Sequence, residues 1–168
     1  MNKRTHPTDT LTHINEDELP SMVRIVNKPV AARKAVAIGT VYINAALAAA
    51  IRQNAVSKGR VLDVARLAGI QAAKKTSELI PLCHLILLES IDLTVQLRGH
   101  RVQIRAAVEA NWKTGVEMEA LTAVAVAALT VYDMGKALDR AIRIDSVQLL
   151  EKTGGTRGNY RLRKGKKP

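Results

Sequence analysis

Residues 91–108, IDLTVQLRGHRVQIRAAV, hold two stretches of alternating apolar and polar side chains on either side of Gly99-His100. We expect Gly99-His100 to be a two-residue hairpin loop in which glycine adopts the positive φ of the first position. Every apolar position then lies beside an apolar partner: Leu97 opposite Val102, Val95 opposite Ile104 and Leu93 opposite Ala106. Because one register satisfies the whole pair, the sequence predicts an antiparallel hairpin with one buried and one solvated face.

A strand and two helical segments are predicted before this hairpin. Residues 33–43 are rich in Val and Ile, which is typical of a strand. Asn44 suits the N-cap of an Ala-rich helical segment that ends near residue 56. Lys58-Gly59 interrupts it, and a second helical segment follows from about residue 60 to residue 78.

A long helix and a last strand are predicted after the hairpin. Thr114-Gly-Val-Glu117 has the form of a capping box, from which the helix continues to about Arg140. The final strand spans residues 142–150, and its apolar phase changes near Asp145-Ser146, where we expect a bulge.

The predicted order of elements is β-α-β-β-α-β. This order is typical of an α+β, ferredoxin-like fold, an antiparallel sheet with helices packed on one face. Thirteen residues without a charge separate Glu119 from Asp133, so the long helix is apolar on all sides. Because the sheet covers only one face of that helix, we expect another subunit to cover part of the rest.

The composition indicates one soluble domain. The chain has 168 residues, of which 47% are hydrophobic, although Trp112 and three tyrosines are its only aromatic residues. It has no run of about 18 uncharged apolar residues and no signal-peptide core, and its single cysteine, Cys83, suits a reducing compartment. We therefore expect a cytoplasmic protein with a flexible arm at 1–20, a ferredoxin-like domain at 21–156 and a basic tail at 157–168.

The positive charge is not confined to the tail. The net charge is +11, of which the tail contributes +6 and the arm −2, so that residues 21–156 carry +7. This surplus favours an anionic ligand for the folded domain.

Candidate chemistry from spacing alone is limited. No phosphate-binding glycine motif occurs, and Cys83-His84 has no second pair at zinc spacing. His84 alone is most often structural, and a lone cysteine is most often a small buried hydrophobe. Asp133 and Lys136, three residues apart, form either a surface ion pair or, if a cleft buries them and lowers the pKa of the lysine, a proton-exchanging pair.

Two longer blocks are specific. Residues 79–84 (LIPLCH) and 114–122 (TGVEMEALT) closely resemble the cyclic pyranopterin monophosphate synthase family, the C proteins of molybdenum cofactor biosynthesis. Further matching blocks, among them 132–134 and 152–155, occur in the right order, and the resemblance extends from about Leu11 to Tyr160.

The resemblance implies a lyase and a catalytic role for the 21–156 domain. Family members convert a 3′,8-cyclo-7,8-dihydroguanosine 5′-triphosphate to cyclic pyranopterin monophosphate and release pyrophosphate. They are homohexamers, trimers of dimers, with the active site at a dimer interface. The resemblance implies no required cofactor and no metal ligand, and it leaves Mg²⁺ open; nucleic acid and membrane are not expected partners.

The resemblance also assigns residues by position. The catalytic positions are matched by Asp133, Lys136 and Lys58. The substrate-binding positions are matched by Leu82, Cys83, His84, Glu117, Met118, Glu119, Arg33 and Lys152. The lysines would transfer protons, Asp133 would orient Lys136, and Arg33 and Lys152 would face the phosphates.

The chain departs from the family pattern at a few positions. A base replaces an acid at Arg24, and the other departures are Ala31 for threonine, Leu85 for proline, Gly135 for cysteine and Thr156-Arg157 for Lys-Ser. These departures keep a catalytically silent paralogue as an alternative. A basic nucleic-acid-binding module on the same fold is another, although its hairpin strands offer no aromatic residue for base stacking.

Overall fold

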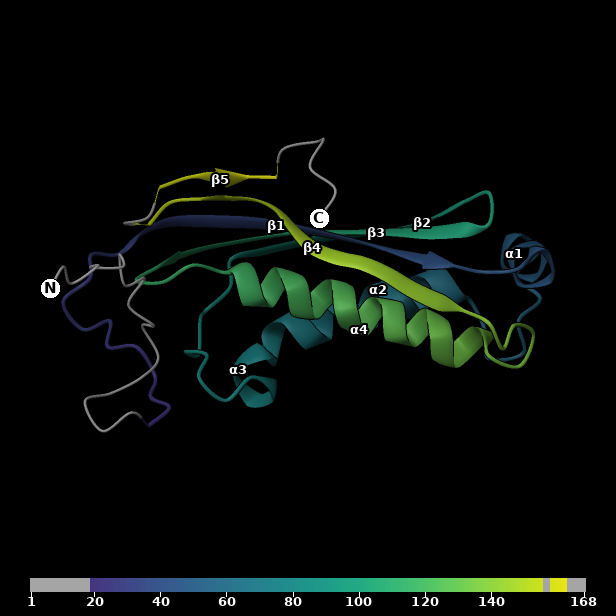
Figure 1. Ribbon diagram of the computed structural model, residues 1–168, viewed down its shortest axis with the longest axis horizontal. Coiled ribbons are helices and arrows are strands. Elements are labelled where there is room, and N and C mark those ends of the chain that lie inside the picture. Colours follow the sequence, from purple (N-terminus) through teal and green to yellow (C-terminus); the bar gives the residue numbers. More distant parts are fainter. Residues whose placement is uncertain (1–18, 156–157, 163–168) are drawn as a thin grey trace, which may run out of the picture.

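The computed structural model describes residues 19–155 and 158–162. Its elements follow one another as β1 (Ala31–Tyr42), α1 (Ala45–Arg52), α2 (Val61–Lys74), α3 (Thr76–Leu79), β2 (Ser90–Arg98), β3 (Arg101–Trp112), α4 (Glu117–Gly135), β4 (Arg143–Thr153) and β5 (Tyr160–Arg161). Figure 1 shows α2 and α4, which pack against each other, on the same face of the sheet. The predicted α+β class, with helices on one face, is confirmed.

β1 lies at the centre of a five-stranded antiparallel sheet with the order β2-β3-β1-β4-β5. It pairs with β3 from Ala31–Trp112 to Tyr42–Arg101, and with β4 along its other edge. The first four strands have the order that two interlocked split βαβ units produce. The ferredoxin-like arrangement is therefore confirmed, and β5 extends it at one edge.

The hairpin between β2 and β3 has the predicted register. Arg98 pairs with Arg101, and each of the apolar pairs expected from the sequence is present. Gly99 has a φ of 59°, as the first position of the loop requires. Leu93 and Val102 are completely buried, whereas Arg98 and Arg105 on the other face are exposed.

The helical segments before the hairpin are shorter than predicted. Asn44 does cap α1, because its side chain accepts a hydrogen bond from the Leu47 amide at 2.8 Å, but α1 ends at Arg52. The predicted second helix is broken at Lys75 into α2 and α3. The Thr76 hydroxyl, which is buried, donates to the carbonyls of the last turn of α2 at this break.

Both predicted ends of the long helix are wrong. α4 begins at Glu117 rather than at Thr114, and no side chain caps it, because the Glu117 carboxylate pairs with Lys152 of β4 instead of turning back. It ends at Gly135 rather than near Arg140, because Asp139 accepts hydrogen bonds from the backbone amides of Asn44 and Ala141 and so fixes a turn there. The helix is about 28 Å long instead of the expected 35–40 Å.

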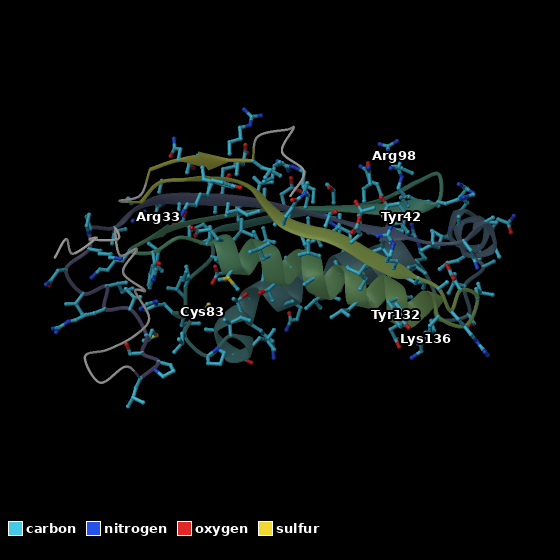
Figure 2. The ribbon with its side chains drawn as sticks, viewed as in Figure 1. Arg33, Tyr42, Cys83, Arg98, Tyr132 and Lys136 are labelled. Carbon is cyan, nitrogen blue, oxygen red and sulfur yellow. The ribbon has the colours of Figure 1, made fainter. Side chains whose placement is uncertain are left out.

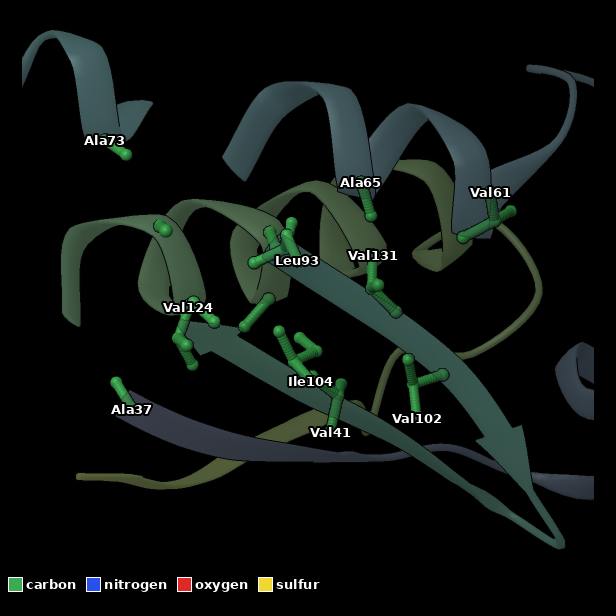
Figure 3. Close-up of a cluster of buried hydrophobic side chains, with 14 of the residues drawn as sticks. Ala37, Val41, Val61, Ala65, Ala73, Leu93, Val102, Ile104, Val124 and Val131 are labelled. Carbon is green, nitrogen blue, oxygen red and sulfur yellow. The ribbon is translucent and has the colours of Figure 1, made fainter. Parts of the chain in front are cut away.

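The core lies between the sheet and the pair α2 and α4, and it consists of small aliphatic side chains (Figure 3). Gly69 of α2 permits the close approach of α4, since a Cβ there would lie 2.7 Å from the Ala123 carbonyl oxygen. By length and composition alone α4 could also cross a membrane. Its burial against α2, β1 and β3 is that of the core helix of a soluble fold.

One side of α4 is not covered by the described part of the chain, as the apolar composition of this helix predicted. Leu129 and Tyr132 are 57% and 39% exposed, and Leu121 and Ala125 are half-buried. An apolar strip of the helix therefore faces away from the described part of the chain.

β4 carries the predicted bulge. Thr40 of β1 pairs with Asp145 and Ile38 with Gln148, so Ser146, which has a φ of 57°, lies in the bulge. The strand continues to Thr153, further than predicted. Of the predicted tail, only residues 158–162 are described, and Tyr160–Arg161 forms β5 beside β4; nearly all of the predicted arm lies outside the described residues.

Candidate active site

A cleft of about 680 Å³ lies at the end of the sheet where β1 begins, β3 ends and α4 begins. Its walls come from five segments of the chain: the stretch before β1, the start of β1, the loop after α3, the β3–α4 connection with the first turn of α4, and the end of β4 with the residues that follow it. Every substrate-binding residue that the sequence predicted lines this cleft: Arg33, Leu82, Cys83, His84, Glu117, Met118, Glu119 and Lys152.

Two cations of the cleft, both on strands, are held in place by residues of α4 and β3. The Lys152 ammonium lies 2.7 Å from the Glu117 carboxylate, and the buried Arg33 donates through Nε to the Trp112 carbonyl at 3.0 Å. Gly155, with a φ of 95°, permits the approach of Arg33, since a Cβ there would lie 2.7 Å from Nη1 of its guanidinium. The Gly-Gly pair after Lys152 thus places Arg33 as well as ending β4.

Glu119 is a buried carboxyl group in a wall of the cleft. It is 3% exposed, and its Oε2 atom has no hydrogen-bond partner among the described residues. Burial, together with the neighbouring charge of Glu117, raises the pKa of Glu119 to about 7. Burial and the proximity of Glu119 also raise the pKa of the Cys83 thiol, so Cys83 is a weak nucleophile here.

Sequence reasoning missed two further cations. Lys28, from the stretch before β1, and Lys113, directly after β3, both line the cleft. Lys113 directly precedes the block 114–122 that carries the family resemblance, so its place in the sequence contained a signal for it. No sequence pattern pointed to Lys28, because it lies in a stretch before β1 that forms neither helix nor strand.

The three predicted catalytic residues form a separate cluster. Asp133, near the end of α4, bridges two lysines: its Oδ2 lies 2.7 Å from Nζ of Lys58 and its Oδ1 lies 2.8 Å from Nζ of Lys136. Lys58 also donates to the Asp133 backbone carbonyl at 2.9 Å. Gly59 follows Lys58 with a φ of 99°, which turns the chain into α2.

The charges of this cluster reinforce one another. Hydrogen bonds from the two lysines, of which Lys136 has the larger effect and Lys58 the smaller, lower the pKa of Asp133 to about 2. Asp133 in turn raises the pKa of Lys136. The spacing left open a surface ion pair or a buried pair with a lowered lysine pKa. Within this single chain Lys136 is half-exposed and the pair is the surface one, with the Asp133 hydrogen bond raising the pKa of Lys136.

The two clusters lie at opposite ends of α4. Glu119 and Asp133 are 14 residues apart on this helix, which is about 21 Å at 1.5 Å per residue. Figure 2 shows the same separation, with Arg33 and Cys83 toward one end and Tyr132 and Lys136 at the other. One chain therefore does not bring its predicted catalytic residues to its own cleft.

The departures from the family pattern leave these contacts intact. Leu85 is 68% exposed, and Arg24 is exposed and does not line the cleft. Ala31 does line it, and so removes a hydroxyl group from its wall. Gly135 packs against Leu47, and Thr156-Arg157 lies outside the described residues.

The described residues contain no group of three or more His, Cys, Asp or Glu side chains that could hold a metal ion. The positive charge around the cleft comes from side chains. Glu117 and Glu119 supply carboxyl oxygens, which suit N–H donors of a ligand.

The chain is a ferredoxin-like domain with a cation-lined cleft and a Lys-Asp-Lys cluster. These features are typical of an enzyme that acts on an anionic small molecule. The chain belongs to the MoaC family, whose model matches residues 22–155.

Curated relatives agree with this membership. A Listeria welshimeri protein is 47% identical over 154 residues, covering 91% of this chain and 96% of the relative. A Thermomicrobium roseum protein is 50% identical over 153 residues, covering 90% and 92%. A Parvibaculum lavamentivorans protein is 45% identical over 155 residues, covering 91% and 97%. Each is named cyclic pyranopterin monophosphate synthase.

Proposed function

We propose that this protein is the molybdenum cofactor biosynthesis lyase that converts (8S)-3′,8-cyclo-7,8-dihydroguanosine 5′-triphosphate to cyclic pyranopterin monophosphate with release of pyrophosphate. The observation that carries the proposal is the cleft, because every substrate-binding residue assigned from the family pattern lines it. The names of relatives at 45–50% identity agree with it.

The cleft offers complementary groups to both ends of such a substrate. A guanine-derived edge presents N–H donors, and the carboxylate of Glu117 and a carboxyl oxygen of Glu119 can accept such bonds. A triphosphate requires fixed cations, which Arg33 and Lys152 supply. When a substrate hydroxyl oxygen attacks the α-phosphorus, the bond from that phosphorus to the bridging oxygen of the β-phosphate breaks and the cyclic phosphate closes. The hydroxyl proton passes to the departing pyrophosphate, directly or through water, and these cations stabilise its negative charge. We propose that no resident metal is needed, so that a chelator leaves turnover with metal-free substrate unchanged.

Proton transfers to and from the opening purine ring fall to the Lys-Asp-Lys cluster. Both ammonium groups are held within hydrogen-bond distance of one carboxylate, which fixes their positions. Directed proton transfer between these ammonium groups and a bound substrate requires that bulk water be kept away from this half-exposed cluster. A covering partner is therefore part of the mechanism.

A second copy of the chain is the covering partner that we propose. The cleft of one copy and the Lys-Asp-Lys cluster of the other meet if two chains pack antiparallel along α4. The exposed strip with Leu129 and Tyr132 then becomes a contact surface, which agrees with its apolar character. We propose that such dimers, three to a hexamer, are the active form, and that the protein acts in the cytoplasm.

Mixed assemblies test the shared site. His84→Ala removes a cleft residue and Lys136→Ala removes a cluster lysine, so homogeneous assemblies of either variant should be inactive. Random mixing of the two at equal amounts places an intact cleft beside an intact cluster at some interfaces, and activity should return to about a quarter of the wild-type level. Mixtures as inactive as the single variants would show that each site is built from one chain.

A further inference from the structure

The stretch before β1 forms a wall of the cleft although it has little regular structure. Val23, Lys28 and Pro29 line the cleft. Residues 21–30 belong to no helix or strand, and within them the Lys28 amide donates to the Ile25 carbonyl in a turn. We call residues 22–30 the wall segment.

One side chain ties the middle of this segment to the rest of the fold. Nζ of Lys113 donates to the Val26 backbone carbonyl at 3.0 Å. Lys113 is the first residue after β3, and the Ala31–Trp112 pair places it beside the start of β1. The anchor therefore sits at the end of a paired strand, whereas residues 22–30 take part in no sheet pairing of their own.

Lys113 itself belongs to the cleft. Among the cleft cations, Lys152 is paired with Glu117 and Arg33 donates to the Trp112 carbonyl. Within the described part of the chain, neither Lys28 nor Lys113 takes part in an ion pair. An ammonium group has three N–H donors, so Lys113 retains donors for an anion after bonding to Val26.

We propose that Lys113 is a positioning residue that holds the wall segment against the cleft through Val26, and so presents Lys28 to the phosphate end of the substrate. An anion in the cleft that contacts both ammonium groups therefore also orders the wall segment. The identity of that anion as a triphosphate rests on the proposed function, whereas the bond between Lys113 and Val26 does not.

Hydrogen exchange of the full-length protein, with and without inorganic pyrophosphate, tests the proposal. In Lys113→Met the backbone amides of residues 22–28 should exchange about tenfold faster than in the wild type, as expected for the loss of one hydrogen bond from a charged donor. Lys113→Arg, which keeps the charge and the donors, should restore most of the protection. Lys74→Met, an exposed lysine of α2, is the matched control and should leave these amides unchanged.

Pyrophosphate separates the positioning role from a purely structural one. It should slow exchange of the wall segment in the wild type and in Lys113→Arg, but much less in Lys113→Met. Equal exchange in the wild type and Lys113→Met, or equal protection by pyrophosphate in both, would overturn the proposal.

Turnover provides the remaining readout. With the cyclic triphosphate substrate, Lys113→Met should raise KM about tenfold while kcat changes less than threefold, because the proton-transferring lysines are untouched. A drop confined to kcat would contradict the positioning role. If exchange changes as expected but the wild type releases no pyrophosphate from this substrate, the proposed function fails and the anchor stands.

Discussion

Glu119→Gln is expected to abolish most of the loss of stability that the wild-type protein undergoes between about pH 5 and pH 8. The substitution keeps the shape of the side chain and removes its ionisation. Glu119 is a suitable target because its carboxyl group is buried and its Oε2 atom lacks a partner among the described residues.

The magnitude follows from the pKa. Burial raises the pKa of Glu119 from 4.5 to about 7. The folded protein therefore holds this proton more tightly than the unfolded chain does. The contribution of the protonated group to the free energy of unfolding is fully present below about pH 4.5 and is lost as the pH rises through about 7. At about 1.4 kcal/mol per pKa unit, the ionised group destabilises the fold by about 3 kcal/mol.

The assay is urea unfolding followed by circular dichroism at several pH values and one fixed protein concentration, because assembly makes stability depend on concentration. At pH 8 the Glu119→Gln protein should be about 3 kcal/mol more stable than the wild type, and at pH 5 the two should agree within about 1 kcal/mol. Glu78→Gln, at an exposed carboxylate, is the control and should follow the wild type at both pH values. Parallel pH dependences of wild type and Glu119→Gln would refute the reasoning.

Three further substitutions probe other parts of the molecule. Asp133→Asn removes the charge that holds both lysines of its cluster, so kcat should fall at least about a hundredfold, while the thermal midpoint changes little. Near-full turnover by this variant would contradict the role assigned to Asp133. Gly69→Ala places a Cβ 2.7 Å from the Ala123 carbonyl oxygen and should destabilise the protein by about 1–3 kcal/mol in urea unfolding. An unchanged urea midpoint would mean that α2 and α4 can move apart at no cost, against the close packing described. Leu93→Ala, at a fully buried position, should cost about 2–5 kcal/mol, and Leu85→Ala, on open surface, less than about 0.5 kcal/mol; equal effects would be inconsistent with the described core.

The hairpin and the order of elements along the chain could be predicted because their determinants are local. Alternation of apolar and polar residues fixes which face of β2 and β3 is buried, and Gly99 fixes where the chain turns. The bulge of β4 left a similar local trace, a change of apolar phase beside Ser146. These features need no knowledge of distant contacts.

The ends of α4 could not be predicted because distant residues decide them. Thr114 and Glu117 have the spacing of a capping box, yet the Glu117 carboxylate finds Lys152, 35 residues away in the sequence. At the other end, Asp139 accepts from the Asn44 amide, 95 residues away. A local pattern competes poorly with an ion pair that only the folded sheet creates.

In the candidate site, too, some features could be predicted from the sequence and others depend on the folded chain. The family pattern identified the side chains, but spacing alone did not place Lys58 beside Asp133, 75 residues further along the chain. Nor did it indicate that the cleft and this cluster lie at opposite ends of one helix. That separation, rather than any single residue, is the reason for expecting two chains in each active site.

Pyrophosphate release from 3′,8-cyclo-7,8-dihydroguanosine 5′-triphosphate, measured with the purified full-length protein and with Lys136→Ala, tests the central claim most directly. We predict one pyrophosphate and one cyclic pyranopterin monophosphate per substrate consumed by the wild type, and no release above background by the variant. Absence of release by a correctly assembled wild type would contradict the assignment of this protein as the lyase.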